Sequence, residues 1–170
     1  ILAKVSAEVN ETIWEVAKRE GTTIPHLCHS GEKGYRSDGN CRACMVEIQG
    51  ERVLSASCVR CPSEGMVVSI SGSRETKARN TVLELLIGDQ PKIDEAHDKS
   101  SHLWKTAQKY GVKSSRFPKI EKIRVPLLDD THVAMTVNLD ACIQCNLCVR
   151  ACREVQVNDV IGMAGRGRDV

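Results

Sequence analysis

The order of apolar and polar positions predicts a series of short strands and helices along the chain. Ile1–Val9 has the apolar character of a strand. Thr12 and Glu15 have the spacing of a capping box, so a short helix is predicted to start there and to end at Gly21. Three further strands are predicted from apolar runs, the first two joined by the hairpin signal Gly50–Glu51: Met45–Gln49, Arg52–Ala56 and Met66–Ile70.

The middle of the chain has the residue spacing of helices. Ser73 is expected to be the N-cap of a helix that runs to about Ile87 and stops at Gly88. The side of this helix predicted to be buried consists of Ala78, Val82, Leu83, Leu85 and Leu86. Later segments are predicted as a second helix, an irregular connector and a short strand: Ser101–Tyr110, Lys113–Pro126 and Val133–Val137.

These elements describe an α+β chain with a thin apolar core. The hydrophobic fraction is 41% and the aromatic fraction only 3%. Small units with few large apolar side chains usually need disulfides or metals for stability. Nine cysteines are available for that purpose, and their odd number fits poorly with a closed set of disulfides.

Charge and hydropathy exclude two classes of partner and indicate a compartment. The formal net charge of +2 argues against nucleic acid as the main partner. No apolar run approaches the ~20 residues needed for membrane insertion. Because no secretory signal precedes the first helix, we expect a cytoplasmic protein, in which clustered cysteines bind metal more often than they form disulfides. The first residue is Ile, so we expect the sequence to be part of a longer chain.

The first cysteine group has the spacing C-x12-C-x2-C-x13-C: Cys28, Cys41, Cys44 and Cys58. A pair separated by two residues lets one tight turn present two thiolates to the same site. Four thiolates beside a glycine-rich loop suit a [2Fe–2S] cluster, because backbone N–H groups can then approach its sulfurs. The sequence therefore predicts a [2Fe–2S] site at these four residues.

A structural zinc site is the alternative for this region. Cys41, Cys44, Cys58 and Cys61 form a C-x2-C-x13-C-x2-C array, which is close to known zinc spacings. Zinc binding there leaves Cys28 without a role, although it lies at the start of the glycine-rich loop. We therefore favour Cys28 as the fourth ligand and expect Cys61 to be a bystander.

The second cysteine group has the spacing C-x2-C-x2-C-x3-C, which is the ferredoxin run for [4Fe–4S] clusters: Cys142, Cys145, Cys148 and Cys152. The first three are predicted to hold one [4Fe–4S] cluster and Cys152 a second one. The proline that usually follows the fourth cysteine is replaced by Arg153. A second run of this kind is needed to complete both clusters, and we expect it beyond Val170.

Several motifs together resemble a known family of redox subunits. Thr23–Cys28 (TIPHLC), Asn40–Glu47 (NCRACMVE) and Ser57–Cys58 followed by Pro62 resemble the N-terminal [2Fe–2S] domain shared by three groups of enzymes. These groups are the large iron–sulfur subunit of respiratory complex I, NiFe- and FeFe-hydrogenase subunits, and NAD-dependent formate dehydrogenases. Segments further along look most like the formate dehydrogenase branch: Ser115–Pro118, Leu128–His132, Cys142–Gln156 and Val157–Gly167.

The resemblance implies a fold and a division of the chain. It implies a β-grasp [2Fe–2S] ferredoxin-like domain at residues 1–72 and a helical connector at 73–126. The first half of a two-cluster [4Fe–4S] ferredoxin-like domain is expected at 127–170. In the wider family the connector holds a further cubane through His-x3-Cys-x2-Cys-x5-Cys. Starting from His97, the cysteine positions of that pattern hold Ser101, Trp104 and Tyr110, so we expect no cluster there.

The resemblance also implies a function, that of the alpha subunit of an NAD-dependent formate dehydrogenase. Formate would be oxidised at a molybdenum or tungsten bis-pterin centre in a later domain of the same chain. The eight cysteines would hold relays that pass electrons toward FMN and NAD in a diaphorase partner subunit. The equivalent subunit of a hydrogenase or of complex I is the alternative, and a zinc-stabilised interaction module is an alternative of another class.

Overall fold

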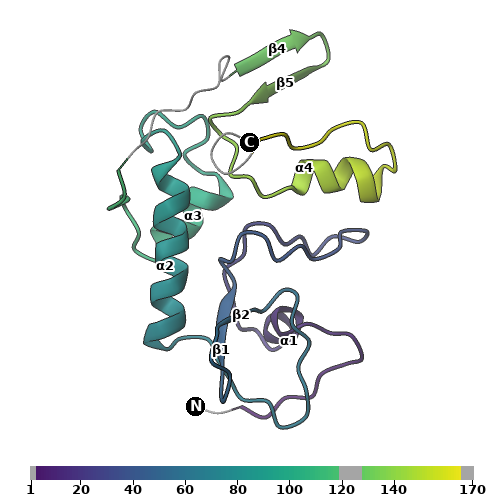
Figure 1. The fold of residues 1–170 in the computed structure, drawn as a ribbon, viewed down its shortest axis with the longest axis vertical. Coiled ribbons are helices and arrows are strands. Elements are labelled where there is room, and N and C mark those ends of the chain that lie inside the picture. Colours follow the sequence, from purple (N-terminus) through teal and green to yellow (C-terminus); the bar gives the residue numbers. More distant parts are fainter. Residues whose placement is uncertain (1–2, 119–127, 166–170) are drawn as a thin grey trace. The chain divides into compact units, whose positions relative to one another are not determined.

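The structure is a computed structural model that describes residues 3–118 and 128–165. It divides into two compact units, an N-terminal unit (Ile1–Arg79) and a C-terminal unit (Asn80–Val170). The predicted division at residues 72 and 126 stays a prediction. The helices and strands, drawn in Figure 1, are, in chain order, α1 (Ile13–Arg19), β1 (Met45–Ile48), β2 (Ser55–Ala56), β3 (Val68–Ser69), α2 (Ser73–Gly88), α3 (His102–Lys109), β4 (Leu128–His132), β5 (Met135–Asn138), α4 (Leu147–Arg150) and the π-helical turn Ala151–Val155.

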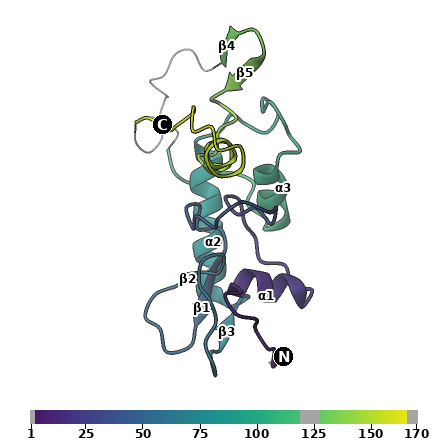
Figure 2. The ribbon, with the colours of Figure 1, turned by 90° about the vertical axis from the view of Figure 1, so that its right-hand side faces the viewer.

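The N-terminal unit packs one short helix against a small antiparallel sheet (Figures 1 and 2). Strand β1 lies in the centre, with β2 and β3 on its two sides. The core joins helix residues Ile13 and Trp14 to sheet residues Val46 and Ile48, together with two of the cysteines. Few large side chains fill this core, as the low aromatic content predicted.

The predicted helix and hairpin of this unit are confirmed. The Thr12 hydroxyl accepts a hydrogen bond from the Glu15 N–H, and the Glu15 carboxylate accepts one from the Thr12 N–H, which completes the capping box. Gly50 has a φ of +86°, a conformation that costs glycine little, in the turn after β1. Both β2 and β3 are shorter than predicted, since each pairs through only two residues.

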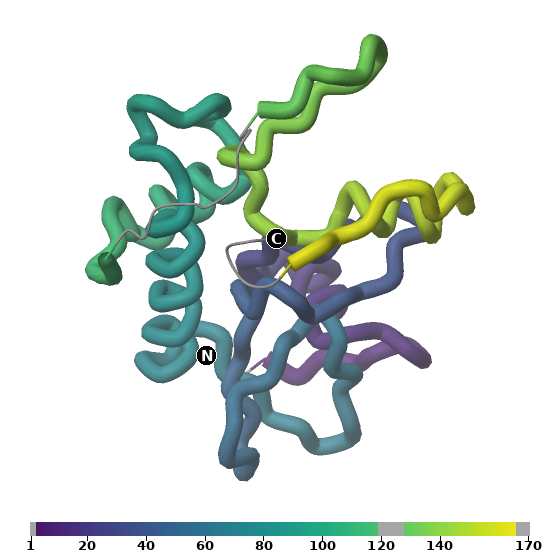
Figure 3. The backbone as a smooth tube through the Cα atoms, turned by 45° about the horizontal axis from the view of Figure 1, so that its top comes forward, coloured from purple at the N-terminus to yellow at the C-terminus, as the bar shows by residue number. Residues whose placement is uncertain are grey.

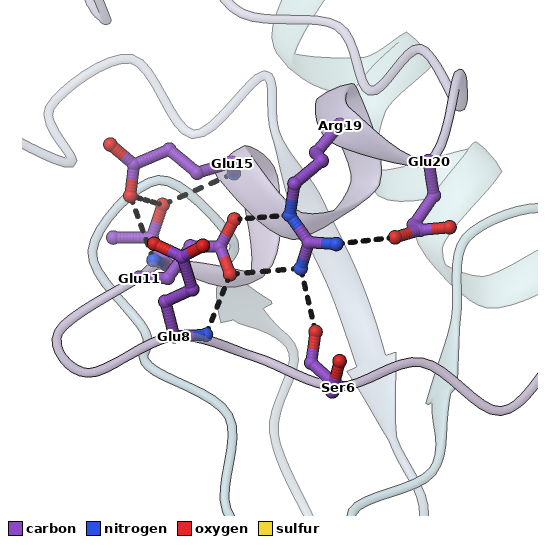
Figure 4. Close-up of polar contacts among 7 residues, drawn as sticks. Ser6, Glu8, Glu11, Glu15, Arg19 and Glu20 are labelled. Atoms are coloured by element: carbon purple, nitrogen blue, oxygen red, sulfur yellow. Dashed lines mark hydrogen bonds and ion pairs between the residues drawn. The ribbon is translucent and has the colours of Figure 1, made fainter.

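The prediction of a strand at Ile1–Val9 is wrong for the described residues 3–9. These residues are exposed and form no strand. Arg19 holds this segment instead, as Figure 4 shows: its guanidinium donates to both carboxylate oxygens of Glu11 at 3.0 Å and to the Ser6 carbonyl at 2.6 Å. Hydrogen bonds from the Arg19 guanidinium therefore hold residues 3–9 against α1, in place of the predicted pairing with a sheet.

Helix α2 covers the predicted range and buries the predicted Leu83, but its other fully buried side chains were not predicted. The buried positions, spaced four residues apart, are Glu75, Arg79, Leu83 and Ile87, whereas the predicted Leu85 is 50% exposed. Glu75 accepts hydrogen bonds from the Ser69 hydroxyl and the Gly72 N–H, and Arg79 donates to the carbonyls of Met45 and Ile70. The first half of the helix is thus joined to the strands of its unit by buried polar groups, which a search for apolar stripes does not find.

In the C-terminal unit, α3 confirms the predicted second helix. The Ser101 hydroxyl accepts a hydrogen bond from the Trp104 N–H at the N-terminus, and Tyr110 is the C-cap. Leu103, Trp104 and Ala107 are buried. The strand predicted at Val133–Val137 is confirmed in part as β5 (Met135–Asn138), because Val133 and Ala134 form the turn that joins it to β4, a strand that was not predicted. The two strands pair in a hairpin that Figure 3 shows (green) standing out from the rest of its unit.

Part of the predicted connector Lys113–Pro126 and the last five residues of the predicted third domain lie outside the described residues. Within the described part of the connector, Arg116 forms an ion pair with Glu84 of α2 at 2.8 Å. None of the helices in the described ranges is long and apolar enough to span a lipid bilayer.

Candidate metal centres

The four cysteines of the first group converge in the N-terminal unit. Cys28, Cys44 and Cys58 are at most 1% exposed, and Cys41 is half-buried. The Cys28 thiol forms hydrogen bonds with the thiols of Cys41 and Cys58, and Cys58 forms another with Cys44. Residues from three separate segments of the chain therefore bring four sulfur atoms into one continuous group.

Backbone N–H groups are directed at these sulfurs. The N–H of Cys41 donates to Cys28 Sγ at 3.3 Å, and the N–H of Cys28 donates to Cys41 Sγ at 3.4 Å. Between the paired cysteines, Arg42 has a φ of +58°, and the next residue, Ala43, donates its N–H to Cys41 Sγ at 3.5 Å. Amides in this arrangement stabilise negative charge on sulfur, as an iron–sulfur cluster requires.

Hydrogen bonds among the four thiols lower the pKa of two of them and raise the pKa of the other two. Hydrogen bonds from Cys41 and then Cys58 lower the pKa of Cys28 far below its ordinary value, and the hydrogen bond from Cys58 lowers the pKa of Cys44 to about 6. Hydrogen bonding to Cys28 raises the pKa of Cys41 and of Cys58. Two of the four sulfurs are therefore favoured as thiolates, which are the form that binds iron.

Helix α1 positions the segments that carry Cys28 and Cys58. Its first N–H groups, at Ile13 and Trp14, donate to the carbonyls of Arg60 and Ser57 at 2.8 and 3.0 Å. The first N–H groups of a helix lack intrahelical partners, so these bonds both complete the helix end and hold the Cys58 loop. The Trp14 indole donates to the Ile24 carbonyl at 3.1 Å, just before Cys28.

The loop between Cys28 and Cys41 is held closely against the group. His29 is 7% exposed, its Nδ1 lies 3.0 Å from Ser37 Oγ, and its ring lies 4.3 Å from that of Trp14. Gly39 has a φ of +64°, and a Cβ added there would lie 3.1 Å from a methyl group of Val59. Glycine at this position lets the loop backbone lie against the residue that follows Cys58.

Cys61, the extra member of the zinc array, does not join the group. It is exposed, and its sulfur lies 3.8 Å from the Asn10 carbonyl. Cys28 lies with the other three cysteines instead. Among the residues that the structure describes, no three His, Cys, Asp or Glu side chains are arranged to hold a single metal ion. The thiols that the structure brings together include Cys28 and leave out Cys61, so they are the set predicted for a [2Fe–2S] cluster and not the set of the zinc array.

The second cysteine group forms a compact loop in the C-terminal unit. Burial is the largest cause that raises the pKa of Cys145, and its interaction with Cys148 and Cys142 raises that pKa further. Gln144 and Asn146 have φ values of +56° and +60°, which fold the chain tightly between the cysteines. The Gln144 N–H donates to Cys142 Sγ at 3.4 Å. These residues fit three ligands of a [4Fe–4S] cluster.

Cys152, the fourth member, lies in the π-helical turn Ala151–Val155. Its sulfur accepts a hydrogen bond from the Val160 N–H at 3.3 Å, and its carbonyl accepts one from the Asn158 N–H. Arg153 forms an ion pair with Asp159 at 2.7 Å, which closes the segment around Cys152. In this chain an ion pair occupies the place where proline usually restrains the backbone.

In the connector, the positions where the wider family has cluster ligands are exposed or have other structural roles. His97 is exposed, Ser101 caps α3, and Trp104 is 6% exposed. The predicted cap and the predicted packing are confirmed.

Sequence reasoning missed several buried polar residues around both groups. Ser57 is fully buried, and its hydroxyl donates to the Cys44 carbonyl at 2.8 Å. Gln90 and Arg150 donate to the carbonyls of Cys142 and Cys145. Ser57 and Arg150 belong to motifs that carry the family resemblance, whereas no sequence pattern singled out Gln90.

Comparison with protein families defines the class. Residues 3–72 match the family described as "2Fe-2S iron-sulfur cluster binding domain". This match and the four converging thiols define residues 3–72 as an iron–sulfur cluster binding domain.

Comparison with individual proteins extends the relationship to nearly the whole chain. It is 32% identical to the mitochondrial NADH-ubiquinone oxidoreductase 78 kDa subunit of Candida albicans, over 98% of this chain and 23% of that protein. It is also 32% identical to the NADP-reducing hydrogenase subunit HndD of Solidesulfovibrio fructosivorans, over 95% of this chain and 28% of that protein. A chain in a crystal structure of an NAD+-reducing [NiFe]-hydrogenase superposes with a TM-score of 0.80 at 30% identity, covering 92% of this chain and 65% of that one.

Residues 3–72 thus match a [2Fe–2S] domain, and nearly the whole chain is similar to subunits of NADH dehydrogenases and hydrogenases. It spans about a quarter of the length of the curated relatives it matches.

Proposed function

We propose that this chain is an electron-transfer segment with two kinds of iron–sulfur centre. Cys28, Cys41, Cys44 and Cys58 would hold a [2Fe–2S] cluster. Cys142, Cys145 and Cys148 would hold one [4Fe–4S] cluster, and Cys152 would be a ligand of a second. The observation that carries the proposal is the group of four converging thiols, three of them buried and one half-buried, with amides directed at them.

When bound, the iron supplies the one-electron chemistry, and the protein sets its potential through hydrogen bonds, burial and charge. The residues of this chain contribute a site with little solvent access at Cys28, Cys44 and Cys58, because all three are buried. They also contribute N–H donors at both cysteine groups.

Iron and acid-labile sulfide analysis of the anaerobically purified chain tests the proposal. We expect at least two irons and two sulfides per chain, with visible absorbance that bleaches on reduction. One zinc per chain and no such absorbance would show instead that this is a zinc-stabilised module.

We further propose that the complete enzyme is an NAD-dependent formate dehydrogenase. The support is the similarity of Leu128–His132 and Cys142–Gln156 to that branch. The molybdenum or tungsten pterin centre would then lie in a later domain of the chain, and FMN and NAD in a partner subunit. The similarity to an NADH-ubiquinone oxidoreductase subunit and to an NADP-reducing hydrogenase subunit favours a second candidate, the equivalent subunit of a hydrogenase or NADH dehydrogenase.

Electron donors distinguish these enzymes. In the intact complex, anaerobic formate should reduce the clusters within the time of a catalytic assay. Reduction by hydrogen and not by formate would identify a hydrogenase, and reduction by NADH alone would identify an NADH dehydrogenase.

A further inference from the structure

We infer that Gln90 and Arg150 are positioning residues of the second cysteine group. They hold two of its backbone carbonyls, and the charge of Arg150 raises the reduction potential of the cluster bound there. The inference rests on the proposed function, because it takes Cys142, Cys145 and Cys148 as ligands of a [4Fe–4S] cluster.

Gln90 comes from a distant part of the chain. Its side-chain Nε2 donates to the Cys142 carbonyl at 3.0 Å, across 52 residues of sequence. It is 8% exposed, and its own N–H donates to the Ile87 carbonyl at the end of α2. Because the Gln90 side chain is buried, this hydrogen bond ties the cysteine loop to the end of α2.

Arg150 makes the corresponding contact from inside the second group. It lies between Cys148 and Cys152 on α4, and its Nη2 donates to the Cys145 carbonyl at 3.4 Å. It is 5% exposed. Arginine keeps its charge in proteins, so a full positive charge is buried against the backbone of Cys145, whose carbonyl it contacts.

The two contacts fix the direction of two amides. In a planar trans peptide, the carbonyl and the following N–H point in opposite directions. Holding the Cys142 carbonyl therefore sets the direction of the Ile143 N–H. In the same way, holding the Cys145 carbonyl sets the direction of the Asn146 N–H. These amides lie on either side of the left-handed Gln144, whose N–H already donates to Cys142 Sγ.

The charge of Arg150 has a separate effect. Reduction adds one negative charge to the cluster, and a buried cation stabilises that charge more than an exposed one because little water screens it. Removing the cation should therefore disfavour the reduced state. Arg153, three residues further on, is 56% exposed, so water screens its charge and its removal should have a smaller effect.

The test is an anaerobic redox titration, followed by electron paramagnetic resonance, of the full-length subunit. Arg150→Gln should lower the ratio of reduced to oxidised cluster at fixed potential by about tenfold, a shift of about 59 mV toward more negative values. Arg153→Gln is the matched control and should shift it less. Arg150→Lys keeps the charge without the planar fork, so it should shift the potential less than Arg150→Gln.

Gln90→Leu tests the hydrogen bond from the Gln90 side chain to the Cys142 carbonyl. It should alter the g-values of the [4Fe–4S] signal, and the exposed Gln108→Leu is its control on α3. If Gln90→Leu fails to load the cluster, the Arg150 series decides the inference.

Two failures are distinguishable. A wild-type subunit without any [4Fe–4S] signal would contradict the proposed function. A wild-type signal whose potential and g-values are unchanged in Arg150→Gln and Gln90→Leu would overturn the inference alone, as would equal shifts in Arg150→Gln and Arg150→Lys.

Discussion

At the scale of single residues, the distinction between ligand and bystander depends on burial and on sulfur–sulfur contacts. Cys28 is fully buried and forms hydrogen bonds with two other thiols, whereas Cys61 is exposed beside the Asn10 carbonyl. Spacing alone left both residues as candidates. The difference between them gives a direct test by substitution.

Cys28→Ser should abolish or strongly alter the [2Fe–2S] signal, because a hydroxyl is a poor substitute for a thiolate ligand of iron. Cys61→Ser should leave the visible and paramagnetic spectra unchanged. The measurement is the spectrum of each reduced variant per mole of protein. The opposite pattern would favour the zinc-like array.

Glu75 is the buried carboxylate most closely tied to the fold. Burial opposes its ionisation, but hydrogen bonds from Ser69 and from backbone N–H groups, with the charge of Arg79, lower its pKa from 4.5. A lowered folded-state pKa contributes stability that is present above about pH 4.5 and is lost as the pH falls through the lowered value.

Glu75→Gln should therefore destabilise the chain by about 1.5–3 kcal/mol at pH 7, the usual size for hydrogen bonds to a charged group. The deficit should shrink as the pH falls below 4.5. Urea unfolding of this variant, the exposed control Glu64→Gln and the wild type at several pH values measures the difference. Loss of the clusters in acid should affect the two variants and the wild type alike. A difference in the free energy of unfolding between Glu75→Gln and the wild type that does not change with pH would contradict the prediction.

At the scale of elements, the seven-residue helix α1 holds both the Cys58 loop and the segment before Cys28. Its N-terminal amides bind the Cys58 loop, and its Trp14 binds the segment before Cys28. So short a helix is not stable alone, so its capping box and its packing must supply the stability. A change in the cap should therefore reach the metal centre.

Thr12→Ala should reduce the free energy of unfolding by about 1 kcal/mol through loss of the N-cap. It should also speed iron release to a chelator, because the Cys58 loop is bonded to the same helix end. Thr23→Ala, an exposed threonine outside the helix, is the matched control. Equal iron release rates in both variants would show that the helix end does not support the site.

At the scale of the whole molecule, each compact unit contains one cysteine group. The apolar cores are thin, and bound metal adds its binding free energy to folding. The fold of the N-terminal unit joins its helix and sheet through a core that includes Cys44 and Cys58.

Removal of iron under anaerobic, reducing conditions should therefore lower the melting temperature of the chain. Differential scanning calorimetry of loaded and iron-free protein measures the change. Reconstitution with iron and sulfide should restore the higher value. An unchanged melting temperature after complete iron removal would show that the cores alone stabilise the fold.

Much of the local structure could be predicted from sequence because its causes are local. The capping box at Thr12, the turn at Gly50 and the cap at Ser101 each depend on residues within one turn of one another. The candidate site was also largely predictable, because cysteine is rarely placed by chance at ligand spacing. The match of residues 3–72 to a [2Fe–2S] domain agrees with the first of the two cysteine groups.

The sequence by itself determined which thiols are available and where most helices and turns form. Only the tertiary structure decided that Cys28 and not Cys61 joins the group, that residues 3–9 are tied by Arg19 and form no strand, and that α2 buries Glu75 and Arg79. The reason is physical. Each of these outcomes depends on carbonyls, sulfurs or charges brought from distant parts of the chain, and a polar residue becomes a good buried residue only when such a partner is in place.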